Sequence, residues 1–270
     1  MKKISLKMIE KKRWLLDKNK KIFCVTEAKE FVDRLGLISV FCNRRLPCLL
    51  KAIYTDDLVN RFEADNRLWG FVHVLISEKW AYYGRILGGN NIIISMQLLP
   101  SLLQIMPISD YRSLYVEGSL SAVEKEIMDT LDTDGPLMSD EIRRKMGIGS
   151  QPAKKRFNRA LEGLQRKLLI CCAGKIQSRW GWHSGLWATT ERWIPKDVTA
   201  RARVLSEEEA RRSLIEKYIY ATARTTSRSI ARFFKWPMRD VVRIVSSLID
   251  KEMVSSYNHK GETYFFKGNL

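Results

Sequence analysis

The stretch "KKRFNRALEGLQRKLLI", from Lys154 to Ile170, contains six Lys and Arg residues together with apolar residues that recur at helical spacing. At 3.6 residues per turn, the apolar residues share one side of a helix and the charged residues fall elsewhere. The pattern predicts an amphipathic helix, and two interpretations of its outer face stay open: an ordinary solvated surface or a DNA-reading surface. The apolar side consists of Phe157, Leu161, Leu164 and Leu168.

The setting of this helix occurs twice in the chain. Each copy opens with a Ser three residues before a Glu, the capping box that starts a helix, in "SAVEKEI" from Ser121 and in "SEEEARRSLI" from Ser206. A second helix, a third helix, a short strand, a turn and another short strand then follow in the same order. The matched apolar pairs are Ile142 with Ile230, Phe157 with Val241, Leu164 with Leu248, and Ile170 with Val254.

This order of elements is the winged helix-turn-helix layout, so the sequence predicts an α+β, mainly α fold with tandem winged helices. In that layout the third helix enters the DNA major groove, the second crosses the phosphate backbone, and the hairpin touches flanking phosphates. Arg and Lys suit phosphates and guanine edges, whereas Asn158 suits adenine. The predicted DNA-binding residues are Lys154, Lys155, Asn158, Arg159, Arg166, Lys175, Arg179, Arg239 and Arg243.

The charge balance points to the same kind of partner. The 270 residues include 47 Lys and Arg against 30 Asp and Glu, which gives a formal net charge of +17. A field of this sign attracts polyanions. Because 45% of the residues are hydrophobic and 10% are aromatic, the charge belongs to folded domains and not to a disordered basic tail. Double-stranded DNA is therefore the predicted partner.

Other protein classes are disfavoured by the residue types that are scarce. The five cysteines include no CxxC pair, and only three histidines occur, so the sequence predicts no metal site, no cofactor and no disulfide scaffold. No apolar run approaches the ~20 residues of a membrane span, and lysines interrupt the apolar part of the first 21 residues. We therefore expect a cytoplasmic protein with no membrane partner. The cysteines are Cys24, Cys42, Cys48, Cys171 and Cys172.

The first of the two hairpins, "AGKIQSRWGWHSGLW", is rich in tryptophan. One interpretation makes Arg179 and Trp180 a wing tip that follows phosphates and wedges against bases. The other has Trp182 and Trp187 packed on the helices, and it is favoured for those two because tryptophan is mostly buried in proteins.

The N-terminal third has a different composition. Residues 1–21 hold nine Lys and Arg, which suits either a DNA-binding arm or a solvated end. From Glu27, "EAKEFVDRLGLISVF" predicts a helix that stops at Gly36 and continues into a short strand. The run Gly88 to Asn91 predicts a hairpin turn, since it lacks the Lys-Ser/Thr of a phosphate-binding loop. An α/β region follows from these signals, and a winged-helix layout for it stays open.

Several motifs in sequence order carry a family resemblance: "YYGRILGGNNIIISMQLLPSLL", "GPLMSDEI", "RALEGLQRKLLICCAGK", "GLWATTERWIP" and "LSEEEARRSLIEKYIYATARTTSRSIARFF". Together they resemble the AlkZ-like DNA glycosylases, and more closely the shorter AlkZ-related group. The resemblance implies tandem winged helices and a role in the repair of alkylated or crosslinked DNA. The expected division of the chain is a basic arm at 1–21, a glycosylase-like region at 22–115, winged helix 1 at 116–200 and winged helix 2 at 201–270.

The catalytic motif of that family is Gln, an apolar residue, then Gln or Asp, which positions the water that attacks the sugar. The corresponding stretch here resembles "LGLISVF", in which Ser39 and Phe41 occupy the two polar positions, or Ile38 and Val40 if the register shifts by one. A phenylalanine can neither position a water nor stabilise an oxocarbenium ion. The sequence therefore predicts a DNA-binding protein that lacks the catalytic pair.

Two alternatives stay open beside this prediction, so that enzyme activity itself is undecided. The first is an active DNA glycosylase whose polar catalytic group comes from elsewhere in the N-terminal region, with Glu63, Asp65 and Gln97 as candidates. Such an enzyme must flip the target nucleotide into a pocket. The second alternative is a transcription regulator, which uses the same helices to read an operator and needs no such pocket.

Overall fold

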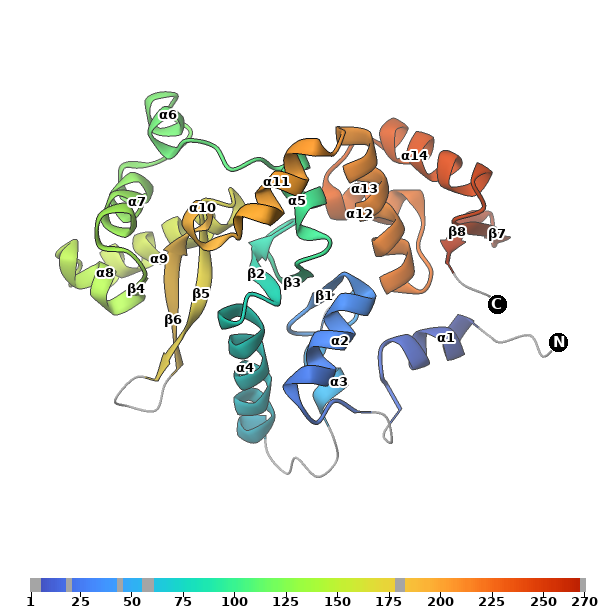
Figure 1. The fold of residues 1–270 in the computed structure, drawn as a ribbon, viewed down its shortest axis with the longest axis horizontal. Helices are drawn as coiled ribbons and strands as arrows, with labels where there is room; N and C mark the ends of the chain where they lie inside the picture. The colour runs from blue at the N-terminus through green and yellow to red at the C-terminus, as the bar shows by residue number, and fades with distance from the viewer. Residues whose placement is uncertain (1–5, 18–20, 43–45, 55–60, 178–182, 268–270) are drawn as a thin grey trace.

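The chain is mainly helical, with three small antiparallel sheets set among the helices of its described residues (Figure 1). The structure is a computed structural model, and it describes residues 6–17, 21–42, 46–54, 61–177 and 183–267. The predicted α+β, mainly α class is confirmed.

In the N-terminal region, a helix runs into a strand where the sequence predicts it. The helix α2 ends at Gly36, whose φ of +77° is a conformation that favours glycine, and β1 follows directly. The turn between β2 and β3 contains Gly88 and Gly89 with φ of +87° and +81°, which confirms the predicted hairpin. The elements are α1 (Leu6–Arg13), α2 (Val25–Leu35), β1 (Leu37–Ser39), α3 (Leu49–Ile53), α4 (Arg61–Ser77), β2 (Ala81–Ile86), β3 (Asn90–Ser95), α5 (Leu99–Ile105) and α6 (Tyr111–Val116).

The first repeat begins at the predicted capping box, where the Ser121 hydroxyl accepts a hydrogen bond from the Glu124 amide. Three helices and a long hairpin follow, and a two-residue strand after the first helix joins the hairpin in the order β4-β6-β5. The sequence had not singled out this strand. The elements are α7 (Ala122–Asp134), β4 (Leu137–Met138), α8 (Ser139–Lys145), α9 (Gln151–Arg166), β5 (Ile170–Gln177) and β6 (His183–Thr189).

The second repeat has the same order of helices and hairpin. A single bridge between Thr225 and Phe265 takes the place that β4 has in the first repeat. The eight side chains that the overlay of the two sequences matched are all buried, which explains why their apolar character recurs. The elements are α12 (Glu207–Thr222), α13 (Ser227–Phe234), α14 (Met238–Asp250), β7 (Ser255–His259) and β8 (Glu262–Phe266), and α10 (Thr190–Trp193) and α11 (Lys196–Val204) connect the repeats.

The N-terminal region follows the same plan a third time. Helix α2, strand β1, helices α3 and α4 and the β2–β3 hairpin correspond in order to α7, β4, α8, α9 and the β5–β6 hairpin. The strand orders correspond as well, because β1-β3-β2 has the same connectivity as β4-β6-β5. The described chain thus contains three units of one topology.

Two apolar cores hold these units together. The larger core joins the N-terminal region to the second repeat, because Val32 of α2 and Ile93 of β3 belong to the same buried cluster as Ile219 of α12 and Phe233 of α13. The smaller core lies within the first repeat and is built mainly from α7, α8 and α9, whereas Cys171 and Cys172 of β5 and Ala188 of β6 belong to the larger core. The three helices of the first repeat therefore have a core of their own, while its hairpin packs in the larger core. Its small core includes Ile127, Leu131, Ile142, Phe157 and Leu164.

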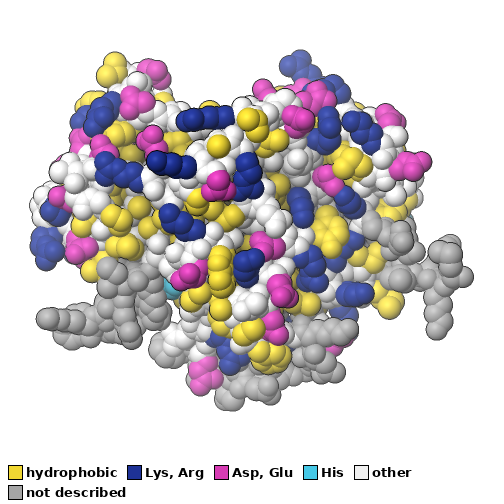
Figure 2. Space-filling model, in the orientation of Figure 1, with side chains coloured by type: hydrophobic (Ala, Val, Ile, Leu, Met, Phe, Trp, Pro, Cys, Tyr) yellow, Lys and Arg dark blue, Asp and Glu magenta, His cyan; other side chains and the backbone are white. Residues whose placement is uncertain are grey.

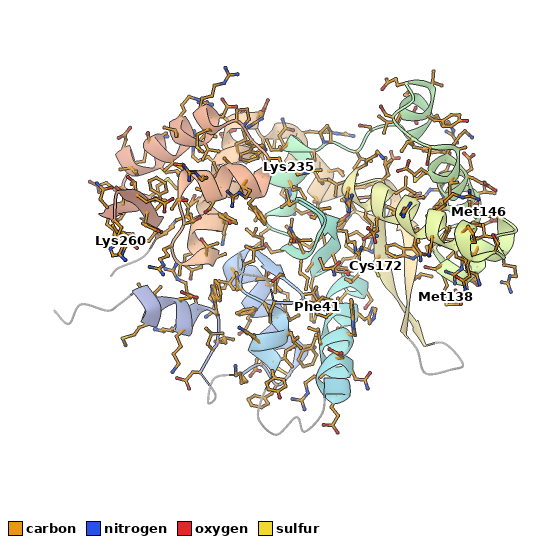
Figure 3. The ribbon with its side chains drawn as sticks, turned by 180° about the vertical axis from the view of Figure 1, so that it is seen from behind. Phe41, Met138, Met146, Cys172, Lys235 and Lys260 are labelled. Atoms are coloured by element: carbon orange, nitrogen blue, oxygen red, sulfur yellow. A yellow bond between two sulfur atoms is a disulfide. The ribbon has the colours of Figure 1, made fainter. Side chains whose placement is uncertain are left out.

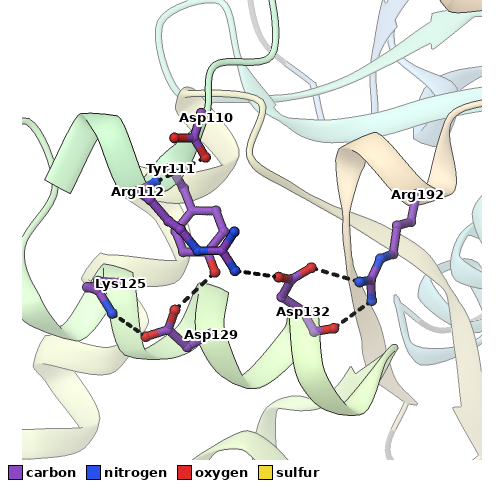
Figure 4. A network of polar contacts seen from close by, with 7 residues as sticks. All are labelled: Asp110, Tyr111, Arg112, Lys125, Asp129, Asp132 and Arg192. Atoms are coloured by element: carbon purple, nitrogen blue, oxygen red, sulfur yellow. Dashed lines mark hydrogen bonds and ion pairs between the residues drawn. The ribbon is translucent and has the colours of Figure 1, made fainter.

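A polar network fixes the first repeat to the segments on either side of it (Figure 4). The Asp132 carboxylate of α7 forms ion pairs with Arg112 of α6 at 3.1 Å and with Arg192 of α10 at 2.8 Å. The Tyr111 hydroxyl donates to Asp129 at 3.0 Å, and burial together with this hydrogen bond raises the pKa of Tyr111 to about 12. The network thus connects α7 to α6, which precedes the first repeat, and to α10, which follows it.

Inside the first repeat, a buried carboxylate joins α7 to α9. Glu124 accepts hydrogen bonds from the Ser121 hydroxyl at 2.9 Å and from the Lys167 ammonium at 2.7 Å. Burial acts to raise the pKa of Glu124, but the hydrogen bonds from Lys167 and Ser121 outweigh it and leave the pKa below its ordinary value. Gly163 makes this approach possible, because a Cβ at that position would collide with Glu124 Oε1.

We expect Gly163→Ala to lower the free energy of unfolding of the first repeat by about 1–3 kcal/mol, because the Glu124 carboxylate cannot retreat without losing its partners. Gly70→Ala is the matched control: Gly70 is also helical, and a Cβ there would have nothing within 4 Å. That change should raise stability by up to about 1 kcal/mol. Urea denaturation measures the free energy of unfolding of both variants. Equal changes in the two variants would contradict a steric collision between the new Cβ and Glu124.

The N-terminal helix α1 and one cysteine pair complete the described fold. The Arg13 guanidinium donates to the Tyr220 carbonyl at 2.8 Å, and the Trp14 indole donates to the Ala221 carbonyl at 2.7 Å. The described part of the predicted arm is therefore docked on the C-terminal end of α12. Cys42 and Cys48 form a disulfide. No disulfide scaffold was predicted from the sequence, and this pair was not singled out there.

Candidate nucleic-acid interface

The surface charge of the molecule is unevenly compensated. On the face shown in Figure 2, Lys and Arg side chains are interspersed with Asp and Glu. Many cations are paired within their own helix, such as Lys29 with Asp33 at 2.6 Å and Arg201 with Asp197 at 3.1 Å. Such pairs add little net field, so the net charge of +17 acts mainly where cations have no acidic partner.

The N-terminal half of α9 is such a place. The Ser150 hydroxyl accepts from the Ala153 amide at 3.4 Å and starts the helix, while Phe157 and Leu161 anchor its inner side in the small core. The positive end of the helix dipole adds to the side-chain charge at this end. Among the described residues, no ion pair involves the four cations of this half, which are Lys154, Lys155, Arg156 and Arg159.

The predicted residues of this half lie outward. Lys155, Asn158 and Arg159 are exposed, and Lys154 is half-buried. Arg156 is exposed as well and is not among the predicted residues, although it lies three residues before Arg159 and so shares a side of the helix with it.

The C-terminal half of α9 has a different environment. The Arg85 guanidinium of β2 forms an ion pair with Glu162, and the Arg85 amide donates to Gln165 Oε1 at 3.1 Å. Arg166 pairs with Glu162 at 3.5 Å and lies against Gly89 in the β2–β3 turn. This half of the helix is therefore docked on the N-terminal region, which sets Arg166 apart from the other predicted residues of α9.

The β5–β6 hairpin projects away from the helices of the first repeat and lies beside α4 (Figure 1). Lys175 lies in β5 opposite Gly185, but its side chain, like the whole of Arg179, lies outside the described part of the chain, as do Trp180 and Trp182. Trp187 is described: its indole donates to the Ser139 hydroxyl at 2.8 Å and its ring packs on the small core. The interpretation of Trp187 as a packing residue is confirmed.

The corresponding helix of the second repeat, α14, carries a more balanced outer face. The side chain of Arg239 is 88% exposed and lies 3.7 Å from Asp240, and Arg243 forms an ion pair with Glu208 at 3.1 Å. Met238 and Val242 are exposed on the same helix. The two predicted arginines of α14 are thus on the surface but next to acids and apolar groups.

The stretch that corresponds to the catalytic motif is closed. Ser39 is 1% exposed, and its hydroxyl donates to the Pro47 carbonyl at 3.1 Å. Phe41 is 37% exposed and meets the edge of the Trp69 ring of α4 with 5.8 Å between centroids (Figure 3). In the shifted register, Ile38 and Val40 are fully buried. Neither register presents an amide or a carboxylate to solvent.

The structure separates the polar candidates for a divergent catalytic group. Asp65 lies four residues before Trp69 on α4, which puts both on one helix face, and this face meets Phe41. Glu63 is exposed in the first turn of the same helix. Gln97 lies beyond the Leu37 end of β1, since Leu37 pairs with Ile94, and Phe41 lies beyond the other end. Of the three candidates, Asp65 is the one that shares a helix face with Trp69, which contacts Phe41.

Phe41 adjoins a cluster of aromatic rings through Trp69. Trp69 is in ring contact with His73 at 5.8 Å and with Tyr83 at 6.0 Å. Burial raises the pKa of Tyr83 well above its ordinary value, so that this hydroxyl stays protonated. Within the described ranges, no group of three or more His, Cys, Asp and Glu side chains could hold a metal ion.

The described helices differ from membrane-spanning helices in length or in polarity. None of them combines the length and the apolar character that crossing a membrane requires. The predicted cytoplasmic location stays a prediction.

Comparisons with known proteins agree with the resemblance seen in the motifs. A family model described as "AlkZ related" matches residues 22–235. The solved structure of the Streptomyces sahachiroi DNA glycosylase AlkZ has a similar fold, with a TM-score of 0.54 and 13% sequence identity over 96% of this chain and 67% of that one. No curated protein matches the sequence. Since the family match spans well over half of the residues, the chain belongs to the AlkZ-related family.

Proposed function

We propose that this protein binds double-stranded DNA through tandem winged helices, with the N-terminal half of α9 as its main contact. The single observation that carries the proposal is the set of four cations on this half, none of which is paired with an acid that the structure describes. The order of helices and hairpin in both repeats supports it, because this order is the one that places a third helix in the major groove.

The roles of the α9 residues follow from their chemistry. Lys154, Lys155 and Arg159 suit phosphate oxygens, and Asn158 can accept from and donate to an adenine edge. The β5–β6 hairpin, with Lys175 and Arg179, is proposed to follow the flanking phosphates as a wing. Arg166 is proposed to hold α9 against the β2–β3 turn, since Glu162 and Gly89 already engage it.

We further propose that the protein binds DNA without excising bases. The motif positions hold a buried serine and an aromatic residue, and neither can orient a water against the sugar. The fold shared with a DNA glycosylase then serves to hold DNA, including damaged or distorted duplexes. The chemistry of base excision is not shared.

An active glycosylase with a divergent catalytic group is the second candidate. One observation favours it: Asp65 shares a face of α4 with Trp69, and Trp69 contacts Phe41 of the motif stretch. A transcription regulator has no observation of its own and is separated by the measurement that follows.

The proposed DNA binding is tested by the affinity of the purified protein for several duplexes of about 30 base pairs with unrelated sequences. We expect saturable binding that weakens steeply with salt and varies only about threefold among the sequences, because phosphate contacts carry no sequence information. A strong preference for one sequence would instead support a regulator. No saturable binding even at low salt would reject the proposal.

A further inference from the structure

The longest segment of the second repeat without acidic residues surrounds α13. Residues 217–239 contain six Lys and Arg and no Asp or Glu. By contrast, the α9 stretch includes Glu162. The segment therefore has a higher density of uncompensated charge than the helix that the winged-helix layout singles out in this repeat, α14.

The structure arranges most of these cations along one exposed surface. Ile230 and Phe233 bury the inner side of α13 in the large core, which leaves Arg228 and Arg232, one helical turn apart, on the outer side. Residues before and after the helix continue the surface. We name this surface the α13 track; it consists of Arg224, Arg228, Arg232 and Lys235, all of which are exposed.

The cations of the α13 track differ from those of α14 in their pairing with acids. In the described chain, none of the four takes part in an ion pair, whereas Arg243 of α14 is paired with Glu208. The α14 face also presents Met238 and Val242 to solvent. Of the outer faces of α13 and α14, that of α13 is exposed and carries no acidic residue of its own helix.

The track lies beside a hollow that the N-terminal helix helps to build. A cavity of about 410 Å³ is lined by Arg224, Arg232 and Ser229, and by Trp14 of the segment after α1. Glu10 and Glu262 also line this cavity, so its negative charges lie on α1 and β8 and not on α13. Lys11 and Lys12, which follow Glu10 in α1, are exposed. The hydrogen bonds of Arg13 and Trp14 to the end of α12 hold α1 in place.

The direction of α13 brings the track toward the rest of the molecule. The helix begins next to β8, where Thr225 bridges Phe265. Seen from behind, Lys235 at the other end of α13 lies near the middle of the molecule, whereas Lys260 in the β7–β8 turn lies at its edge (Figure 3). In this view the track therefore runs from the edge of the second repeat toward the middle of the molecule.

We propose that the α13 track binds the phosphate backbone of the same duplex that α9 holds. This inference rests on the proposed function. The second helix of a winged helix crosses the backbone, so contact through α13 needs only charge and no reading of bases. The second repeat then acts as a sequence-independent clamp, and contacts with bases are left to the first repeat.

The test compares Arg228→Gln/Arg232→Gln with a control of equal charge change, Lys29→Gln/Arg201→Gln, whose cations are already paired within their own helices. Affinity for a duplex of about 30 base pairs is measured over a range of salt concentrations. Loss of two phosphate contacts should weaken binding on the order of tenfold and lower the slope of log affinity against log salt by about 1.8. The control should change either quantity far less.

A third variant, Arg228→Lys/Arg232→Lys, separates charge from structure and should retain the wild-type slope. Sedimentation of the complex should give one duplex per chain. A Gln variant that matches the control, or two duplexes per chain, would overturn the inference while α9 still binds DNA. Failure of the proposed function differs, because the wild-type protein would then show no saturable binding.

Discussion

Replacing Lys155 and Arg159 by Glu is expected to weaken binding of duplex DNA by about 100-fold at moderate salt. Both side chains are exposed on the N-terminal half of α9, and no acid compensates either of them among the described residues. Each reversal removes a phosphate contact and adds repulsion, so the slope of log affinity against log salt should fall by about 2 or more. Fluorescence anisotropy on a labelled duplex measures both quantities.

Two variants serve as controls for this expectation. Lys155→Arg/Arg159→Lys keeps both charges and should bind nearly as tightly as the wild type. Lys29→Glu/Arg201→Glu has the same change of net charge away from α9 and should weaken binding much less. Equal losses in the α9 variant and this second control would mean that net charge alone, and not this helix, determines the affinity.

Phe157→Ala is expected to cost the first repeat about 3–5 kcal/mol of folding free energy. Phe157 is fully buried at the centre of the small core, and removal of its ring leaves a cavity that few neighbours can fill. Because this core is separate from the large one, we expect α7, α8 and α9 to unfold first. Hydrogen exchange followed by mass spectrometry should show faster exchange in these helices only.

The conservative change Phe157→Leu keeps most of the volume and should leave the exchange pattern close to that of the wild type. A comparison with Phe233→Ala, in the large core, should show the opposite distribution, with faster exchange in the N-terminal region and the second repeat. Uniform acceleration over the whole chain in both variants would contradict the existence of two separately packed cores.

The sequence predicted the parts of the fold that local signals determine. The capping boxes at Ser121 and Ser206 and the buried pairs from Ile142 to Val254 established the order of both repeats. Gly36 marked the end of α2 because its positive φ excludes most other residues. These features depend on residues that are close in sequence, so they can be predicted from a single sequence.

Tertiary pairing was harder to see. Strand β4 has two residues, and its partner in β6 lies almost 50 positions later, so no local pattern reveals it. The third occurrence of the topology stayed an open alternative in the sequence for a similar reason, since α3 has only five residues and leaves little periodic signal. Docking of the C-terminal half of α9 on Arg85 was also invisible, because helical spacing cannot tell which partner covers a polar face.

The candidate site divides in the same way. The outward position of Lys155, Asn158 and Arg159 followed from periodicity, whereas the different environment of Arg166 followed only from the β2–β3 turn. The α13 track was overlooked because the winged-helix layout directs attention to the third helix. Its lack of acids between residues 217 and 239 was nevertheless present in the sequence.

The central claim is that this AlkZ-related chain holds duplex DNA without hydrolysing the bond between base and sugar. The most direct measurement is the release of bases from duplexes with alkylated or crosslinked nucleotides, at protein excess and under conditions in which binding of the same duplexes is saturated. Since neither Ser39 nor Phe41 can position a water, we expect complete binding and no abasic sites above the rate without protein. Formation of abasic sites by the wild-type protein, and its loss in Asp65→Asn, would contradict the claim and assign the catalytic group to α4.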